Sequence, residues 1–539
     1  MTVTSLPLAT STPTSASALV VGPVATAKTS NPATNIVPPG EFGGGMLRFS
    51  VPEPGPHFDI HREVSPAIST WGIGLIYSRI FRNADSGSAN LVECELCESW
   101  EYVDADNLRI KLRPDITWQD IDPLNGRRLV AADVVFSLDR QRAPGNPNGD
   151  LLTGVKTISV VDDVTFNMSL TPGGLNADLL LNLADGRTRI VAPEAVAING
   201  DLIRGPNVGS GPWVWVETTA QTAAYNRNTD YFESGEPGID GLRISYISNQ
   251  ETRMAAYRTG LLDIVDTVIA ADVTKAHRRL SGANSVLITT PGSGVEIALN
   301  TTEVPFDSLL FRRAVFRAMD PWEDIDQIWD GGGLVTLGIP VPRSSWLLSQ
   351  DAMRTAFADI ERAGELLSQS GISQGLPIEI TVGQFGDRYL LQAQRVAQAL
   401  GLLGFDTTIR EVTTREFADD VWIGGDYHVF VGAQAPVDGV NNDLFSIHHS
   451  SGLWNTTGFS TDELDELIEM QAAQVDQSDR RRTLLDAQFR ILEGAHRFTV
   501  SARQTYWLAR EWVGEFDPDT TRGENSWLSK LTLADHEEI

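Results

Sequence analysis

The sequence predicts a mixed α/β protein built from at least two lobes. Three short segments in its first half alternate apolar and polar residues, which is the pattern of strands with one buried face. After about residue 290, apolar residues recur every three or four positions, the pattern of amphipathic helices. One later stretch alternates strand, helix and strand, the unit from which parallel sheets are built.

The three predicted strands of the first half are Met46–Val51, Leu108-Arg-Ile-Lys-Leu112 and Thr165–Leu170. Each alternates residue by residue, so one face would be buried and the other exposed. The first strand follows three glycines, which predicts that the folded protein begins near residue 43.

Two helices of the second half are predicted from their apolar stripe and their start. One follows Pro305-Phe-Asp-Ser308 and carries its apolar face at Phe311, Ala314, Val315, Ala318 and Met319. The other is predicted to begin at Ser460, because Ser460-Thr-Asp-Glu463 has the spacing of a capping box in front of Leu464.

A β-α-β unit is predicted between these helices. Residues 378–382 and 407–412 are expected to be parallel strands. The connecting helix ends at Gly404, and its apolar face comprises Tyr389, Ala393, Val396, Leu400 and Leu403.

Composition and charge exclude several classes of protein. The chain has 539 residues, with 71 acidic against 42 basic side chains and a net charge of −29. This excess of acid disfavours a nucleic-acid binder, which needs clustered Lys and Arg to neutralise phosphates. No stretch reaches the roughly 18 uninterrupted apolar residues of a membrane span.

The first 40 residues are rich in Ser, Thr, Pro and Ala, with Lys28 as their one charge. Such a segment buries too little apolar area to offset its ordering entropy, so residues 1–41 are predicted to be a disordered tether. It lacks the basic start and long apolar core of a clean signal peptide. A lost export signal and a plain disordered terminus both remain open.

The two cysteines, Cys94 and Cys97, form a single C-x-x-C. A second such pair and suitably spaced histidines are absent from the sequence, so a zinc site is not expected. We expect an incidental or locally bridged pair.

Catalytic and metal motifs are weak throughout the sequence. It contains no G-x-S-x-G, no H-E-x-x-H and no Walker-type lysine loop, so no catalytic residue, metal ligand or cofactor is predicted. Asp330-Gly-Gly-Gly-Leu334 is interpreted as a flexible loop, and His57 and His61 as loop residues rather than ligands. His448 and His449, being adjacent, make a still weaker metal site.

The tryptophans could line a ligand cleft, as aromatic side chains often do, or pack in the core. Core packing is the simpler interpretation for any single one of them. The candidates for a cleft lining include Trp71, Trp213, Trp215, Trp422 and Trp454.

A series of short motifs, in order along the chain, resembles the extracytoplasmic solute-binding proteins of peptide and nickel ABC importers, solute-binding family 5. Gly209-Ser-Gly-Pro-Trp213 and the following Tyr225-Asn-Arg-Asn-Thr-Asp-Tyr231 are similar to its "G-T-G-P-Y … R-N-P-D-Y" signature. Further similar segments are Pro56-His-Phe-Asp-Ile-His61, Glu98-Ser-Trp-Glu101, Ile110-Lys-Leu-Arg-Pro114, Ala132-Asp-Val-Val-Phe-Ser137, Glu251-Thr-Arg-Met-Ala-Ala256 and Ala298-Leu-Asn-Thr-Thr302. The resemblance covers roughly residues 44 to 539.

The resemblance implies a two-lobed periplasmic-binding-protein-like α/β fold (type II, of the large cluster C kind) with a hinge between the lobes. Lobe I would comprise residues 42–285, with residues 490–539 returning to it, and lobe II residues 286–489. Two crossing segments, near residues 285 and 490, would form the hinge.

The resemblance also implies ligand-binding residues. The loop along the ligand would be Glu63, Val64, Ser65 and Pro66, with Gln384 at a strand end of lobe II. In peptide binders an aspartate of lobe II faces the ligand's amino group. Here the matching loop, 433–443, contains Gln434 and places Pro436 in the ungapped position, so Asp438 would serve only after a shift of two residues. This departure leaves a sugar, an opine or a metal chelate open as ligands beside a peptide.

The function expected from this resemblance is that of the extracytoplasmic substrate-binding subunit of an ABC importer. It would capture a peptide or peptide-sized solute by hinge closure and deliver it to the permease subunits, as a monomer, without catalysis and without nucleic acid. The alternatives are a signalling or chaperone-like receptor on the same fold and, less favoured, a hydrolase.

Overall fold

The computed structural model describes residues 44–84, 88, 90–104, 106–172, 176–280, 282–437, 439–500 and 504–534. The chain divides into two units, Met1–Pro39 and Gly40–Ile539, and every described residue belongs to the second. The tether predicted over residues 1–41 lies outside the described residues.

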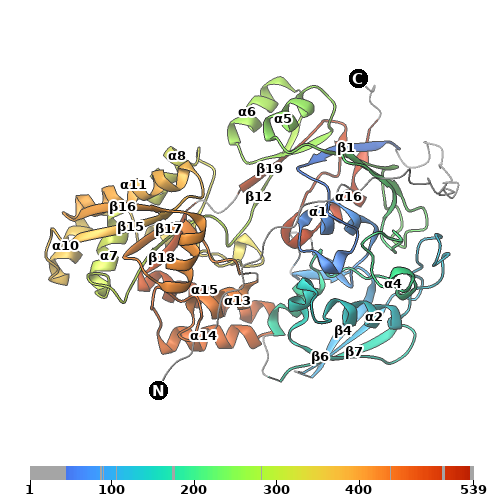
Figure 1. The fold of residues 1–539 in the computed structure, drawn as a ribbon, viewed down its shortest axis with the longest axis horizontal. Helices are drawn as coiled ribbons and strands as arrows, with labels where there is room; N and C mark the ends of the chain where they lie inside the picture. The colour runs from blue at the N-terminus through green and yellow to red at the C-terminus, as the bar shows by residue number, and fades with distance from the viewer. Residues whose placement is uncertain are drawn as a thin grey trace, which may run out of the picture. The chain divides into compact units, whose positions relative to one another are not determined.

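Two four-stranded sheets contain most of the early strands (Figure 1), and they confirm the three strands predicted there. One sheet has the order β1 (Met46–Val51), β10 (Gly241–Tyr246), β9 (Thr222–Arg227) and β8 (Trp213–Thr218), with β1 and β10 parallel. The other is antiparallel, in the order β4 (Cys97–Asp104), β5 (Asn107–Leu112), β7 (Thr165–Leu170) and β6 (Val155–Val160). Along β5 and β7 the apolar residues are buried and the polar ones more exposed, as their alternation predicts.

Short hairpins and helices connect these sheets. β2 (Phe81–Asn83) and β3 (Val92–Cys94) form a hairpin, and β20 (Val513–Gly514) pairs with β21 (Thr532–Leu533) across a longer connection. The helices are α1 (Pro66–Ser69), α2 (Ala131–Gln141), α3 (Leu179–Leu183), α4 (Pro193–Asn199), α5 (Gln250–Arg258) and α6 (Ala270–Arg279). Of the two alternatives expected for the cysteines, an incidental pair and a locally bridged one, the structure has the bridge, a Cys94–Cys97 disulfide.

A six-stranded mixed sheet forms the core of the second half (Figure 1). Its order is β14 (Val335–Thr336), β18 (Arg497–Val500), β13 (Val295–Leu299), β17 (Val429–Ala433), β15 (Pro377–Gly383) and β16 (Asp406–Val412). Strand β15 is parallel to both of its neighbours, and the other pairs are antiparallel.

The predicted β-α-β unit is confirmed in β15, α11 (Asp387–Leu402) and β16. Helix α11 buries Ala393, Val396 and Leu400, three members of the predicted apolar face. The chain turns after the helix at Gly404, whose φ of +85° is a conformation that a glycine adopts without steric cost.

Helix α7 (Leu309–Ala318) begins as predicted, because the Ser308 side chain accepts a hydrogen bond from the Phe311 N–H. The predicted start of α14 (Asp462–Ala473) is wrong by one residue. Thr461, not Ser460, caps it and accepts from the Leu464 N–H, so Glu463 does not occupy the third helical position that a capping box requires. The remaining helices are α8 (Pro321–Ile328), α9 (Gln350–Arg354), α10 (Ile360–Ser370), α12 (Thr414–Phe417), α13 (Val440–Asp443), α15 (Gln477–Gly494) and α16 (Trp527–Lys530).

The chain passes twice between the six-stranded sheet and a three-stranded one, in which β19 (Gln504–Ala509) lies between β11 (Ile264–Thr267) and β12 (Asn284–Thr289). The first passage is between β12 and β13, and the second is between β18 and β19. Residue 490 lies within α15, and β18 still pairs with β13. We therefore propose a hinge segment at residues 290–294, with lobe I extending to residue 289, and we propose that lobe I resumes at β19. Residues 501–503 are outside the described ones.

After the second passage the chain packs against the N-terminal half. The buried Arg79 guanidinium pairs with Glu524 at 2.9 Å and with Glu95 at 3.2 Å. The Trp527 ring of α16 packs against Trp71 and Trp507. These contacts support the predicted return of the C-terminal segment to lobe I.

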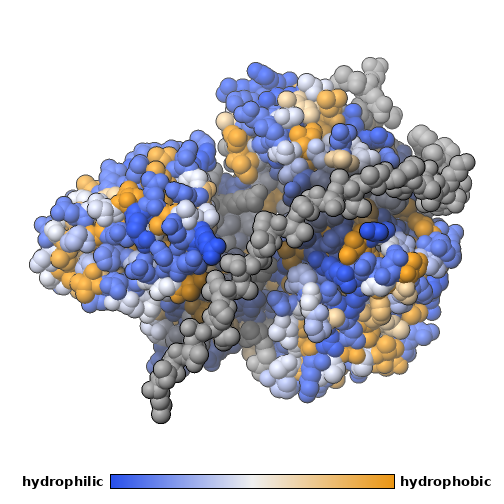
Figure 2. Space-filling view, in the orientation of Figure 1, coloured by the Kyte–Doolittle hydropathy of each residue, from blue (hydrophilic) through white to orange (hydrophobic). Residues whose placement is uncertain are grey.

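Hydrophilic side chains cover most of the coloured surface in Figure 2, with hydrophobic ones scattered among them. Within the described residues, no helix has both the length and the hydropathy to cross a membrane.

Candidate functional site

A cavity of about 700 Å³ lies between segments of the two proposed lobes. This volume is within the range of roughly 300–1,000 Å³ that is typical of small-molecule sites. Its lobe I wall includes Val64, the 3-10 helix η3 (Pro147–Leu152), several residues between 153 and 187, and Arg522. Its lobe II wall is formed by residues between 436 and 454.

The lobe I wall is held in place by buried polar contacts. Asn148 of η3 is buried and donates to the carbonyl oxygens of Ile60 (3.1 Å) and Glu63 (2.9 Å). These hydrogen bonds tie η3 to the loop that carries Val64, so the two parts of this wall have a common support.

The lobe II wall is a short helical segment that follows Gly439, whose φ is +84°. Helix α13 continues into the π-helix η7 (Leu444–His448), and the segment contributes Asn441, Asn442 and Ser446 to the cavity. Trp454 completes this wall, and its main-chain N–H donates to the Ser446 carbonyl oxygen at 2.9 Å.

A buried ion pair joins the two walls. Arg480 of α15 pairs with Asp178 at 2.7 Å, and their side chains are 2% and 9% exposed. The Asn441 N–H also donates to Asp178, at 3.2 Å, and Arg480 donates to the Ala177 carbonyl oxygen at 3.0 Å. Burial raises the pKa of Asp178, but the charges of Arg480 and Arg522 more than offset it, so this pKa lies below its ordinary value.

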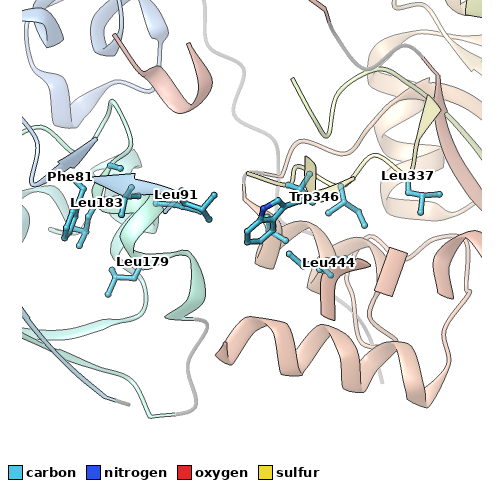
Figure 3. Close-up of a cluster of buried hydrophobic side chains, with 14 of the residues drawn as sticks. Phe81, Leu91, Leu179, Leu183, Leu337, Trp346 and Leu444 are labelled. Carbon is cyan, nitrogen blue, oxygen red and sulfur yellow. The ribbon is translucent and has the colours of Figure 1, made fainter. Parts of the chain in front are cut away.

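Apolar and main-chain contacts lie beside this ion pair. Figure 3 shows the buried Leu91 and Trp346 side chains pointing toward each other from the two sides. The Leu91 N–H donates to the Gln477 side chain of α15 at 3.0 Å, and Arg343 donates to the carbonyl oxygens of Ala84 and Asn90. The two sides are therefore joined by these hydrogen bonds as well as by the ion pair.

Two arginines that line the cavity share a buried carboxylate. Asp185 accepts two hydrogen bonds from the Arg187 guanidinium, at 2.9 and 3.0 Å, and lies 3.5 Å from Arg522. Arg522 also donates to the Asn182 side chain at 2.6 Å. Burial raises the pKa of Asp185, and Arg187 and Arg522 together lower it below its ordinary value.

The predicted loop along the ligand is partly at the cavity. Val64 lines it, whereas Glu63, Ser65 and Pro66 precede or follow that residue without lining it. The Glu63 carboxylate accepts from the N–H groups of Val64 (2.8 Å) and Ser65 (3.0 Å), so these two main-chain donors are satisfied within the loop.

The structure does not bring the predicted lobe II residues together at this cavity. Gln384 is exposed at the end of β15, and Gln434 donates to the Gly338 carbonyl oxygen at 2.8 Å; neither lines the cavity. Asp438 lies outside the described residues, although Pro436, Val437 and Gly439 line the cavity. The ligand-binding roles of all these residues stay predictions.

Sequence reasoning missed the ion-paired residues of the cavity. Asp178 and Arg187 lie nine residues apart, Arg480 and Arg522 lie far along the chain from them, and no local pattern links the four. Of the tryptophans named in the sequence analysis, Trp454 lines the cavity, whereas Trp213 is buried in the core.

Buried titratable groups lie behind the lobe II wall. His448 Nε2 lies 3.9 Å from Asp443, and the His448 and His496 rings are 6.3 Å apart. Burial raises the pKa of Asp443 well above its ordinary value and lowers the pKa values of both histidines well below theirs. The two histidines are therefore neutral near pH 7, and Asp443 keeps its proton to a higher pH than an exposed aspartate does.

The histidine considered at the N-terminal loop has a structural role. His61 is buried, with Nε2 2.9 Å from the Arg189 carbonyl oxygen and Nδ1 2.9 Å from the Arg140 guanidinium. Burial and the Arg140 charge lower the pKa of His61 to about 4. Among the described residues, no group of three or more His, Cys, Asp or Glu side chains could hold a metal ion.

Known proteins share both the sequence family and the fold. Residues 92–454 match the model of "bacterial extracellular solute-binding proteins, family 5 Middle". Heme-binding protein A of Haemophilus influenzae is 27% identical over 57% of this chain and 58% of its own length. The dipeptide-binding protein of Escherichia coli is 24% identical over 57% of this chain and 60% of its own length. Each alignment thus spans less than two thirds of the relative.

The solved structure of HbpA2 from Haemophilus parasuis has the same fold, with a TM-score of 0.78 and 20% identity over 91% of this chain and 100% of that one. The predicted two-lobed periplasmic-binding-protein-like α/β fold is therefore confirmed. Because the family model covers most of the chain, the protein belongs to the bacterial extracellular solute-binding proteins of family 5.

Proposed function

We propose that this chain is the extracytoplasmic substrate-binding subunit of an ABC importer, and that it captures a peptide or peptide-sized solute for a membrane permease. The observation that carries the proposal is the cavity, which is lined from both sides by segments of a chain that passes twice between two sheets. Relative motion about two such passages opens and closes a cavity of this kind.

Binding and release, rather than a reaction, is the proposed role. The family is one of solute-binding proteins, and the cavity lining is mostly amide, hydroxyl and apolar groups. We propose that the protein acts as a monomer, with no cofactor and no nucleic-acid partner. The alternative function is that of a signalling or chaperone-like receptor on the same fold. Transport of the bound solute by a reconstituted permease would distinguish an importer subunit from such a receptor.

The ligand panel for a test follows from the open alternatives. Purified protein is heated with di- to pentapeptides, sugars, opines and nickel chelates, and the shift in melting temperature is measured. A ligand at a hundred times its Kd adds about 2.7 kcal/mol to the free energy of unfolding, which gives a measurable shift. Mass spectrometry of copurified small molecules identifies a ligand outside this panel.

A pair of variants locates the binding site. Asn442 is exposed and lines the cavity, so Asn442→Trp would fill part of the cavity without disturbing the core. Gln369 is exposed on α10 and does not line it, so Gln369→Trp is the matched control. Loss of the ligand-induced shift in Asn442→Trp alone supports the proposal. Absence of any shift with the whole panel, and of any copurified solute, would contradict it.

The role of Asp438 remains a hypothesis from the sequence. If its carboxylate pairs with a ligand ammonium in a closed site, Asp438→Ala lowers peptide affinity by about 2–5 kcal/mol. Isothermal titration with the best peptide of the panel measures this loss, and an unchanged affinity rejects the role.

A further inference from the structure

The ion pair of Asp178 and Arg480 is built as a plug and a socket that belong to the two proposed lobes. The socket lies in lobe II, where the Arg480 guanidinium donates to the Gln471 side chain twice, both times at 3.2 Å, and to the Asn441 side chain at 3.1 Å. Gln471 also donates to the Asn441 side chain, at 2.9 Å. The guanidinium therefore has hydrogen-bond partners on its own lobe that do not depend on Asp178.

The plug is the stretch of lobe I at Ala177 and Asp178. The Asp178 carboxylate lies 2.7 Å from the Arg480 guanidinium and accepts from the Asn441 N–H at 3.2 Å. The Ala177 carbonyl oxygen accepts from Arg480 at 3.0 Å. On its own lobe, Asp178 is attracted by the charge of Arg522, which helps to lower its pKa. Both charges of the pair thus keep a favourable neighbour on their own side when the two sides separate.

This contact lies at the cavity itself. Asp178 and Asn441 line the cavity from opposite walls, and the hydrogen bond between them joins the walls directly. A hinge rotation that moves these walls apart breaks this hydrogen bond together with the ion pair. Opening returns both charges to water and closing removes that water again, so the contact stabilises the closed form only by the surplus of its interactions over this desolvation.

We propose that Asp178 and Arg480 form a reversible lock between the lobes, which is made when the cavity closes and broken when it opens. Both residues are then positioning residues for solute capture, because they act through the closure of the lobes. A larger closed fraction raises the affinity for a solute that binds the closed form. This inference rests on the hinge motion of the proposed function, but it does not depend on which solute binds.

The distance between the lobes in solute-free protein tests the lock. Spin labels on Asp163→Cys and Gln369→Cys, at exposed positions of lobes I and II, report this distance by double electron–electron resonance. The native cysteines are bridged to each other, so the labels attach to the introduced thiols. The test variant is Asp178→Asn, which removes the charge of the plug and nearly keeps its shape. Arg480 is kept, because the socket within lobe II depends on it.

A buried ion pair within one lobe supplies the matched control. Asp324 of α8 lies 2.5 Å from Arg395 of α11, and both helices belong to lobe II. The Asp324 and Asp178 side chains are similarly buried, at 6% and 9% exposure. Asp324→Asn therefore perturbs a comparable aspartate without removing a contact between the lobes.

We expect a population of wild-type protein with the label distance of the present structure, which is the closed form. In Asp178→Asn, closure would bury Arg480 without a counter-charge, so the ratio of closed to open protein should fall by at least about tenfold, as for the loss of one hydrogen bond to a charged group. Asp324→Asn should keep the wild-type ratio. With tri-alanine as the probe, stopped-flow measurements should show faster dissociation in Asp178→Asn alone.

Other outcomes separate the lock from the proposed function. An unchanged ratio in Asp178→Asn overturns the lock and leaves solute binding intact, because the ion pair would then lie at a pivot that stays formed as the lobes move. An equal fall in Asp324→Asn also overturns it, since the cause would be a general loosening of the fold. If the ratio falls in Asp178→Asn alone but no solute binds, the lock stands and the proposed function fails.

Discussion

Removal of the Arg480 side chain is the most direct test of the contact between the two walls. We consider Arg480→Met, which keeps much of the length of the side chain but removes its guanidinium. In the wild-type protein that guanidinium lies 2.7 Å from Asp178 and donates to Ala177, Gln471 and Asn441, at 3.0 to 3.2 Å.

The magnitude follows from burial. Both partners are nearly inaccessible, and without the guanidinium Asp178 would keep the Asn441 N–H, at 3.2 Å, as a main-chain hydrogen-bond donor. Removing one partner of a buried pair costs about 3–5 kcal/mol, because a buried charge loses its compensation. Since the pKa of Asp178 is lowered in the folded protein, the stability it contributes is present above its ordinary pKa of 3.8 and is lost as the pH falls further.

Urea denaturation at pH 7 measures the change in the free energy of unfolding. Arg480→Met is expected to lose about 3–5 kcal/mol, and the double variant with Asp178→Asn should recover at least about 2 kcal/mol because no charge is left unpaired. Arg482→Met is the control, since Arg482 lies on the same helix and pairs at 3.1 Å with the exposed Asp479; such pairs contribute about 0–1 kcal/mol. A loss below about 1 kcal/mol in Arg480→Met, or no recovery in the double variant, would refute the reasoning.

Three further expectations concern other parts of the chain. Asp443→Asn should raise the free energy of unfolding at pH 7 but hardly at pH 3.5. The pKa of Asp443 is raised in the folded protein, so the wild-type carboxyl destabilises the fold only as the pH rises above about 3.8. Denaturation at both pH values measures this difference, and an equal gain at both would contradict it. Replacement of Cys94 and Cys97 by Ser should cost about 2 kcal/mol, the loop-closure value for so short a loop, and should leave solute affinity unchanged. Thr461→Ala should destabilise the protein by about 1 kcal/mol, whereas Ser460→Ala should have little effect; the reverse order would restore Ser460 as the cap of α14.

Local patterns in the sequence predicted individual elements well. The strands β1, β5 and β7 were predictable because each alternates along a half-buried surface. The β-α-β unit was predictable because its helix stripe and Gly404 are local signals. The start of α14 was wrong because Ser460 and Thr461 are both good caps, and the choice between them depends on the path of the preceding chain.

The passages between sheets were less predictable. The motif order indicated two lobes, but the second passage was predicted near residue 490, which lies in α15. All four residues of β18 are buried, as in a core strand of either lobe, and its pairing with β13 and β14 assigns it to the six-stranded sheet. Pairing between distant strands has no local signature, so a boundary of this kind requires the tertiary structure.

The sequence by itself determined the α/β class, the family resemblance and the segment of lobe II that reaches the cavity, because these depend on periodicity and on short ordered motifs. The tertiary structure alone decided which charges face that cavity and which are already compensated. Asp150 and Asp178 are indistinguishable as single aspartates in the sequence. Arg480, some 300 residues away, buries and pairs with Asp178, whereas no described residue pairs with Asp150. Electrostatic compensation acts through space, so its partners cannot be read from neighbours along the chain.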